Sequence, residues 1–514
     1  MKKQILTLAL LICSWMAMAQ TSYPPYDFKV ANVDGDTLYY RITSSSAPYT
    51  VAVTRCMDSA FHTLHVPHTA FDVGQPGYAY PLYNYDSLIT IPSEVSYNGI
   101  TYSVSAIDNE AFYFQWGIKK VILPATVTTI DTAAFYHSRV SEIVMPGVQQ
   151  ILYGAFCGTP LEQVELPPTL TWLGEAAFAF CSIRIVDIPC GVSVLQHSTF
   201  FKCPLEKIIL HEGLEEIEED AFGAEKMDSL IFPSTLKKLG RMLSDTYFPQ
   251  IPEIQCHYVG FQEGNSPLEL GDYCMYCFKK LRTLQLPNNL VSLGTSCFEM
   301  SGLDSLVIPE GVTIIPNNCF AYCDSLKSVK LPQSLVNIDD GAFLSTSHLH
   351  VVTIPNQVLQ IGLNVFECYE NNTGLERVNM ECVIPPAINN NSFPTHPIQF
   401  TIPCHTLASY QEAPIWSTQE NFSFVEDCTL TEDYEKSPIE VFPNPTNGII
   451  YVRSTYEGMY LIVIYNSFGQ QILKQPVQVN CSLLDFSGLP AGMYYLKEIG
   501  NNNVKNITKI IVEK

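Results

Sequence analysis

The sequence has few basic residues for its length. Lysine and arginine number 28 against 51 aspartates and glutamates, so the formal net charge is −23. Proteins that bind nucleic acids or anionic membranes use clusters of lysine and arginine to contact phosphates. This balance therefore argues against nucleic acid as a partner and against binding to an anionic lipid surface.

The sequence also lacks the motifs of common catalytic and metal sites. We find no Gly-x-Ser-x-Gly, no phosphate-binding loop, no His-Glu-x-x-His and no Gly-x-Gly-x-x-Gly. Cys274 and Cys277 have the spacing of a zinc half-site, but a structural zinc needs four ligands and no second pair is suitably spaced. We therefore expect no enzyme activity, no cofactor and no metal. The enzymatic alternative is a hydrolase within residues 21–90, a short segment without a nucleophile motif.

Long apolar runs are missing beyond the N-terminus. Residues 1–19 have the features of a signal peptide: a basic start, a short apolar run and the small-x-small site Ala17-Met18-Ala19. No later stretch approaches the roughly 20 continuous apolar residues of a membrane helix. We expect a secreted chain with no transmembrane segment after cleavage. Acylation of Cys13 is the alternative, and the bulky residue before it argues against a lipoprotein.

What the sequence does contain is a repeat with two markers in phase. The frame apolar-x-[Val/Ile]-x-[Leu/Ile]-Pro is followed, after about ten residues, by Ala-Phe-x-x-Cys. Away from an irregular stretch at 241–272, the phenylalanines recur every 20–23 residues and the prolines every 21–23, with His211 in the place of one proline, a period typical of solenoids. The prolines are Pro124, Pro146, Pro167, Pro189, Pro233, Pro287, Pro309, Pro332 and Pro355. The phenylalanines are Phe112, Phe135, Phe156, Phe178, Phe200, Phe222, Phe278, Phe298, Phe320, Phe343 and Phe366.

The frame predicts one short strand in each repeat. Because strand side chains alternate, Val164 and Leu166 point inward, while Gln163 and Glu165 point outward. Proline then ends the strand, since it has no N–H for the ladder. One repeat buries too few apolar side chains to offset its ordering entropy, so the repeats must stack. We predict a β-rich solenoid of short parallel strands with irregular or short helical returns.

Changes in composition divide the rest of the chain. Residues 20–90 lack the repeat and predict a β-rich N-terminal cap. The solenoid covers 91–380, its C-terminal cap 381–428, and a polar, acidic linker 429–438. Residues 439–514 contain short β-rich runs between turn signals, which predicts a small β-sandwich.

Two segments allow alternative interpretations. The run Asn32-Val33-Asp34-Gly35-Asp36 is either a calcium loop or a turn between strands, and the missing twelve-residue EF-hand loop favours the turn. The irregular stretch at 241–272 is either a drifted repeat or a binding loop, because insertions in repeat arrays map to loops on one face.

Seventeen cysteines in a secreted chain favour disulfides over redox chemistry. Most of them, however, occupy repeat positions, where cysteine serves as a small buried residue. Cys181 and Cys203 are equivalent positions of adjacent repeats and lie within disulfide reach if their side chains face each other. Cys404 and Cys428 are candidates for a disulfide that closes the C-terminal cap.

Outward strand positions supply the candidate binding residues. Several residues of one such column are apolar, and exposed apolar patches often mark interaction sites. The alternative is ordinary β-propensity on an exposed strand. The candidates for partner binding are Ile122, Val144, Ile209, Ile231 and Val307, with Ile209 and Ile231 first because they fall in consecutive repeats.

The frame and the Ala-Phe-x-x-Cys motif resemble the BspA-like leucine-rich-repeat family over residues 90–428. The segment Ile402-Pro403, Tyr410, Ala413 and Trp416 is similar to the usual end of that family. The resemblance implies a leucine-rich-repeat fold and a secreted or surface-exposed adhesin or interaction protein, with no catalytic residues.

Residues 439–514 resemble the C-terminal sorting domain of the type IX secretion system of Gram-negative bacteria. The resemblance rests on Pro443-Asn444-Pro445 with Gly448, on Gly469, on Gly492 within Leu-Pro-Ala-Gly-x-Tyr, and on the terminal Lys-Ile-Ile-Val-Glu-Lys. It implies export across the outer membrane by the secretion machinery and attachment to the outer surface. Cys481 departs from the pattern.

Together these features predict a secreted or cell-surface protein that mediates adhesion or protein–protein interaction. The expected partners are a protein or glycan ligand on host or bacterial surfaces and the type IX machinery. The alternative is a structural spacer or envelope component without a specific ligand.

Overall fold

The computed structural model describes residues 26–55, 85, 87–242, 254–368, 374–428, 439–442, 449–454, 460–466, 470–477, 482–500 and 503–512. The predicted signal peptide and the predicted linker lie outside the described residues. The chain divides into two compact units. The N-terminal unit comprises Met1–Lys226 with Ser244–Thr246, and the C-terminal unit comprises Met227–Leu243 with Tyr247–Lys514.

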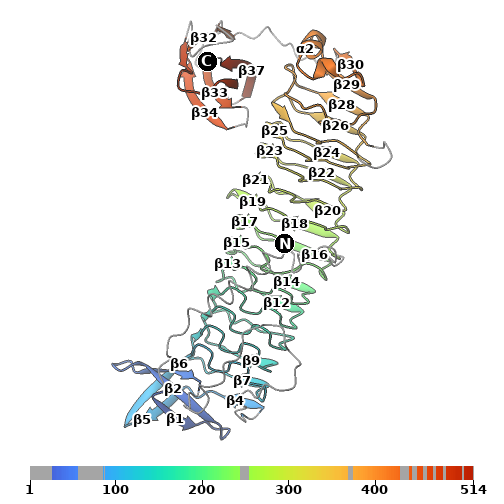
Figure 1. The fold of residues 1–514 in the computed structure, drawn as a ribbon. Helices are drawn as coiled ribbons and strands as arrows, with labels where there is room; N and C mark the ends of the chain where they lie inside the picture. The colour runs from blue at the N-terminus through green and yellow to red at the C-terminus, as the bar shows by residue number, and fades with distance from the viewer. Residues whose placement is uncertain are drawn as a thin grey trace, which may run out of the picture. The chain divides into compact units, whose positions relative to one another are not determined.

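Within each unit the repeats form the coils of a solenoid, as predicted (Figure 1). Most coils contribute a first strand, which runs up to the repeat proline, and a shorter second strand. Strands of neighbouring coils pair in parallel, with Val121 opposite Ile143 in the N-terminal unit and Leu306 opposite Val329 in the C-terminal unit. The inward positions are buried, so each coil covers the apolar face of the next.

The first strands have outward side chains at alternate positions. In the N-terminal unit they are β4 (Leu88–Thr90), β7 (Lys120–Ile122), β9 (Glu142–Val144), β12 (Ile185–Asp187) and β14 (Lys207–Ile209). In the C-terminal unit they are β16 (Ser229–Phe232), β18 (Tyr258–Phe261), β20 (Thr283–Gln285), β22 (Ser305–Val307), β24 (Ser328–Lys330), β26 (Val351–Ile354), β28 (Arg377–Met380), β29 (Ile398–Pro403) and β30 (Phe422–Asp427).

The second strands follow the proline turn of each coil. In the N-terminal unit they are β6 (Ile100–Ile107), β8 (Thr129–Ile130), β10 (Gln150–Ile151), β11 (Trp172–Leu173), β13 (Val194–Leu195) and β15 (Glu216–Ile217). In the C-terminal unit they are β17 (Lys238–Leu239), β19 (Leu268–Leu270), β21 (Leu290–Ser292), β23 (Ile314–Ile315), β25 (Asn337–Ile338) and β27 (Gln360–Ile361).

The N-terminal unit begins with β-structure that extends the sheet of the second strands. The strands β1 (Phe28–Ala31), β2 (Thr37–Ser44) and β3 (Thr50–Thr54) form an antiparallel meander, and β3 pairs in parallel with β6. Strand β5 (Glu94–Tyr97) forms a hairpin with β6. Its turn residues Asn98 and Gly99 both have positive φ, as a type I′ turn requires.

The buried phenylalanines stack in file along the coils. In the N-terminal unit the ring centroids of Phe156 and Phe178 lie 5.1 Å apart with an interplanar angle of 1°, and those of Phe178 and Phe200 lie 5.5 Å apart at 4°. A second file in the C-terminal unit runs from Phe298 to Phe393 with similar spacing. The backbone N–H of Phe156 donates to the carbonyl of Ala177, which fixes the register of the file.

The irregular stretch contains one additional coil, formed by β18 and β19. The backbone N–H of Met275 donates to the carbonyl of Cys297. In the next coil the backbone N–H of Phe298 makes the equivalent bond to the carbonyl of Cys319. Met275 therefore occupies the phenylalanine position of this coil. The prediction that Phe278 is its anchor is wrong, although Phe278 is buried three residues later.

A helical segment closes the last coils of the C-terminal unit. Helix α2 (Leu407–Glu412) and the 3₁₀ turn η1 (Trp416–Thr418) carry the buried side chains of Tyr410 and Trp416. The hydroxyl of Tyr410 donates to the carbonyl of Cys382 at 2.7 Å, and the indole N–H of Trp416 donates to that of Pro386 at 2.8 Å. These bonds satisfy polar groups that the apolar cap would otherwise leave buried without partners.

The C-terminal residues form two antiparallel sheets around one core, in agreement with the predicted sandwich. The core contains Ile450 and Leu484 from one sheet and Ile464, Leu496 and Ile510 from the other. The first sheet comprises β31 (Ile439–Phe442), β32 (Ile449–Ser454) and β35 (Ser482–Asp485). The second comprises β34 (Gln471–Val477), β33 (Tyr460–Asn466), β36 (Gly492–Gly500) and β37 (Asn503–Val512).

Candidate binding face

The outward side chains of the first strands form ladders that run across the coils of each unit. Charged members of these ladders pair between neighbouring coils of the N-terminal unit. Lys120 pairs with Glu142, and Arg184 pairs with Glu206. These side chains are exposed, so such pairs add little stability. They hold the long side chains in place beside the apolar outward residues.

Ile122 and Val144 are direct neighbours on this face. They are register partners in β7 and β9, next to the Lys120–Glu142 pair. Ile122 is half-buried, and Val144 is 40% exposed. The structure therefore brings two of the predicted residues into one apolar patch.

Ile209 and Ile231 belong to different units, and each has a register partner within its own unit. The register partner of Ile209 is Asp187, whose carboxylate also lies 2.6 Å from Nε2 of His211. Ile209 is half-buried. Ile231 belongs to the other unit, where its register partner is Gly260 of the additional coil, and it is 57% exposed.

Val307 is an isolated apolar residue on its face. It is 61% exposed, and its register partner in β24 is Lys330. Counting repeats in the sequence places both Val307 and its neighbour Lys330 in this column.

The prediction missed apolar residues at the other outward position of the first strands. Ile185 is 53% exposed at the start of β12. Val351 at the start of β26 is also exposed. The signal was available, because every three-residue strand has two outward positions and the predicted contact used the later one alone.

The cysteines three residues after the anchor phenylalanine are buried thiols that serve as hydrogen-bond donors. Cys181 Sγ donates to the carbonyl of Phe156 at 3.1 Å, and Cys203 Sγ donates to that of Phe178 at 3.0 Å. In the C-terminal unit Cys323 donates likewise to Phe298, and burial raises the pKa of its thiol to about 12. Each thiol thus satisfies a buried carbonyl of the preceding coil.

This arrangement explains why Cys181 and Cys203 are both free. Each thiol points at a carbonyl of the preceding coil and not at the other sulfur, as a disulfide would require. Cys404 and Cys428 lie just beyond the ends of β29 and β30 and are joined by a disulfide with a Cα–Cα distance of 4.6 Å.

The Asn32–Asp36 segment is a turn that attaches the N-terminal meander to the first coil. The side-chain oxygen of Asn32 accepts hydrogen bonds from the backbone N–H groups of Asp34 and Asp36. The Asp34 carboxylate accepts one from the N–H of Thr90 in β4. The described residues contain no cluster of three or more potential metal ligands.

Part of the predicted sorting motif can be placed in the C-terminal sandwich. Gly492 begins β36, and the hydroxyl of Tyr494 donates to the carbonyl of Pro490 at 2.9 Å. The remaining motif residues Pro443, Asn444, Pro445, Gly448 and Gly469 lie outside the described residues.

Comparison with known families accounts for the repeat. The BspA type leucine rich repeat region matches residues 92–203, 128–246 and 256–393 in six copies, which together span more than half of the chain. The chain belongs to the BspA type leucine-rich-repeat family. No curated protein matches this leucine-rich-repeat chain.

The C-terminal sandwich has its own family match. Residues 440–513 match the secretion system C-terminal sorting domain. This leucine-rich-repeat protein is therefore exported by the type IX secretion machinery to the cell surface or beyond it. Within the part of the chain that is described, no helix has the length and apolar character needed to cross a bilayer.

Solved structures similar to this leucine-rich-repeat protein come from several bacteria. A leucine-rich repeat protein from Bacteroides ovatus is 20% identical, with a TM-score of 0.48, over 78% of this chain and 100% of that chain. A leucine rich cell surface protein from Faecalibacterium prausnitzii is 20% identical, with a TM-score of 0.38, over 69% and 96%. The pneumococcal vaccine antigen PcpA is 16% identical, with a TM-score of 0.38, over 79% and 98%.

Proposed function

We propose that the exported chain is an adhesion or interaction protein that binds a protein or glycan on a host or bacterial surface. It remains attached to the outer surface of the bacterium and acts by binding, without catalysis or a cofactor. The outward face of the first strands makes the contact.

The observation that carries this proposal is the patch of Ile122 and Val144. Interfaces typically combine an apolar centre with a polar rim, and the Lys120–Glu142 pair supplies such a rim here. A purely solvated face has no need for apolar residues at adjacent outward positions. Ile185 supplies a further exposed apolar position in the same unit.

A structural spacer without a specific ligand is the competing function. Strand propensity alone favours isoleucine and valine, and this accounts for an exposed apolar residue such as Val307 beside a lysine. The two functions differ in one consequence, since only a binding face loses activity when its apolar residues become charged.

The test is the double substitution Ile122→Lys and Val144→Lys in the exported protein. We expect attachment to immobilised host matrix or to partner bacteria to fall at least tenfold, with an unchanged thermal unfolding midpoint. Trp172→Lys is the matched control, because Trp172 is similarly exposed in the same unit but belongs to the second strand β11. Normal attachment by the folded double variant would reject this face.

Single lysine substitutions at Ile209, Ile231 and Val307 then map how far the contact extends. A graded loss would assign these residues to the contact. Attachment unaffected by any of them would confine the contact to the Ile122–Val144 patch.

A further inference from the structure

One strand of the sorting sandwich, β33, is buried on both of its faces. In β33, Ile462 and Ile464 point into the sandwich core. Val463 alternates with them and points outward, yet it is only 1% exposed. Tyr495 in β36 is also buried outside that core. A two-layer sandwich leaves its outer faces to solvent unless something covers them.

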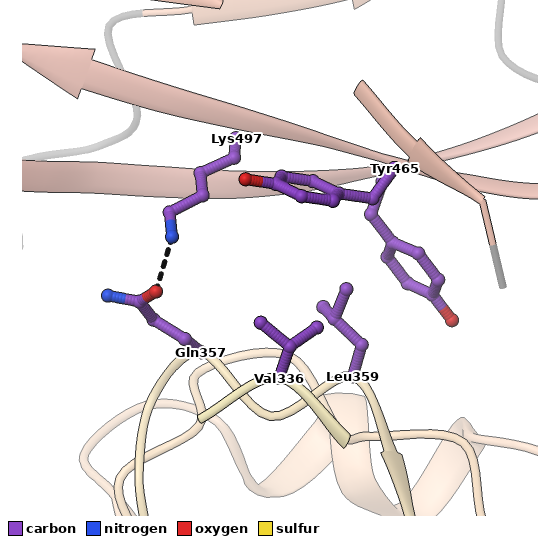
Figure 2. Close-up of a pocket in the computed structure, with 6 residues that line it drawn as sticks. Val336, Gln357, Leu359, Tyr465 and Lys497 are labelled. Atoms are coloured by element: carbon purple, nitrogen blue, oxygen red, sulfur yellow. Dashed lines mark hydrogen bonds between the residues drawn. The ribbon is translucent and has the colours of Figure 1, made fainter. Parts of the chain in front are cut away.

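Over Tyr495 the cover is formed by two coils of the solenoid within the same unit. Val336 and Leu359 form an apolar cluster with Tyr495. Beside this cluster Lys497 Nζ donates a hydrogen bond to Oε1 of Gln357, as Figure 2 shows. The same ammonium group lies 5.9 Å from the ring centroid of Tyr465. Burial lowers the pKa of Lys497, in keeping with a site withdrawn from water.

The two apolar solenoid residues of this contact, Val336 and Leu359, differ from the residues at the same position of the N-terminal unit. They occupy the outward position at the start of the second-strand segment. In the N-terminal unit that position is polar in six coils: Ser105, Thr128, Gln149, Thr171, Ser193 and Glu215. In the C-terminal unit Thr313 is polar, whereas Val336 and Leu359 are apolar and only 8% exposed. Val291 holds the same position and is 38% exposed.

We propose that the outer sheet face of the sorting domain docks in cis on the coils that carry Val336, Gln357 and Leu359, as a latch that the export machinery must open. The latch covers an apolar part of the passenger together with the face of β33 and β36. It is a second role for the sorting domain, independent of ligand binding by the first strands.

A weak contact is enough for such a latch. About ten residues, 429–438, join Cys428 to Ile439, and a short tether gives an effective concentration on the order of millimolar. A contact with millimolar intrinsic affinity is then closed about half of the time or more. The polar partner of Lys497 is a neutral amide, so opening the latch breaks no ion pair at that site.

Cross-linking of the full-length precursor tests the latch. Gln357→Cys and Lys497→Cys are introduced together, treated with a short bismaleimide, and the linked peptide is quantified by mass spectrometry. The control pairs Lys497→Cys with Val291→Cys, which holds the same coil position as Val336 but is exposed. We expect at least tenfold more 357–497 than 291–497 linkage, and equal yields would overturn the proposal.

A second pair of variants makes the test independent of the introduced cysteines. Leu359→Glu places a charge in the contact, and Val291→Glu places the same charge outside it. We expect hydroxyl-radical labelling of Tyr495 to rise several-fold with Leu359→Glu and to stay unchanged with Val291→Glu. Tyr495 that is labelled in the unmodified protein as fast as exposed Tyr322 would contradict the latch.

Discussion

The regular coils of the N-terminal unit differ instructively from the additional coil of the C-terminal unit. In the regular coils every buried anchor is phenylalanine, and from Phe112 to Phe200 each ring stacks on the next at 5.1–5.5 Å. In the additional coil the anchor is Met275, and the backbone bond to the next coil is nevertheless retained. The backbone ladder thus sets the register of a coil, while the stacked rings fill its interior.

The comparison extends to the residues around the anchor. Most turns of the N-terminal unit place two left-handed residues four positions apart, such as Gly154 and Gly158 around Phe156. The second of these positions holds His137, Gly158 and Phe180 in consecutive coils, all with positive φ. The left-handed backbone conformation is therefore repeated at this position although the side chain differs from coil to coil. Such differences are tolerated because each coil packs only against its neighbours.

The largest expected effect comes from opening a cavity in the file. Phe156→Ala removes a ring stacked on both sides and should cost about 3–5 kcal/mol of unfolding free energy. Met275→Ala should cost less, near the lower end of about 2–5 kcal/mol, because a flexible thioether fills its site less specifically. Urea unfolding of both variants measures the difference, and an equal or larger cost at Met275 would contradict the comparison.

Alanine substitutions at Gly154 and Gly158, the two glycines of one turn, should have intermediate and unequal effects on stability. Both have positive φ, so alanine at either position costs about 1–2 kcal/mol through its backbone. A Cβ at Gly154 meets nothing closer than 3.9 Å, whereas one at Gly158 falls 2.6 Å from the ring of His137. Gly158→Ala should therefore lower the unfolding midpoint clearly more than Gly154→Ala. Equal midpoints would show that the His137 ring moves aside freely.

The smallest expected effect is a pH dependence of opposite sign at two histidines. The hydrogen bond to Glu175 raises the pKa of His197, so its contribution is present at low pH and lost as the pH rises through that pKa. Burial lowers the pKa of His137, so protonation of the unfolded chain removes stability as the pH falls below about 6.5.

His197→Gln should therefore reduce the fall in Tm on the high-pH side by about 1 °C. His137→Gln should reduce the fall in Tm on the low-pH side by a similar amount. Thermal unfolding from pH 5 to pH 8 checks this prediction. Changes on the same side of the profile for both variants would contradict the assigned shifts.

Much of the fold follows from the sequence because solenoid contacts are local and periodic. Proline and phenylalanine spacing alone predicts the parallel coils and the file of Phe156, Phe178 and Phe200. The predicted anchor position is three residues too late in the additional coil, because Phe278 fits the aromatic position of the repeat and the true anchor is Met275. The apolar neighbours Ile122 and Val144 were found for the same periodic reason.

Contacts between segments far apart in the sequence were beyond that reasoning. The bond between Lys497 and Gln357 joins residues from the sandwich and the solenoid, and no period relates them. The apolar side chains of Val336 and Leu359 at a position that is polar in six coils of the N-terminal unit were the available signal. Reading it required the register of the second strands, which the structure supplies.

Binding through the first strands is tested most directly by side-chain footprinting of the exported protein with and without the matrix protein or cell surface to which it attaches. Binding through this face predicts protection centred on Ile122 and Val144 in β7 and β9, with the second strand β11 unchanged. Protection confined to β11, or no protection of the first strands at saturating ligand, would contradict it.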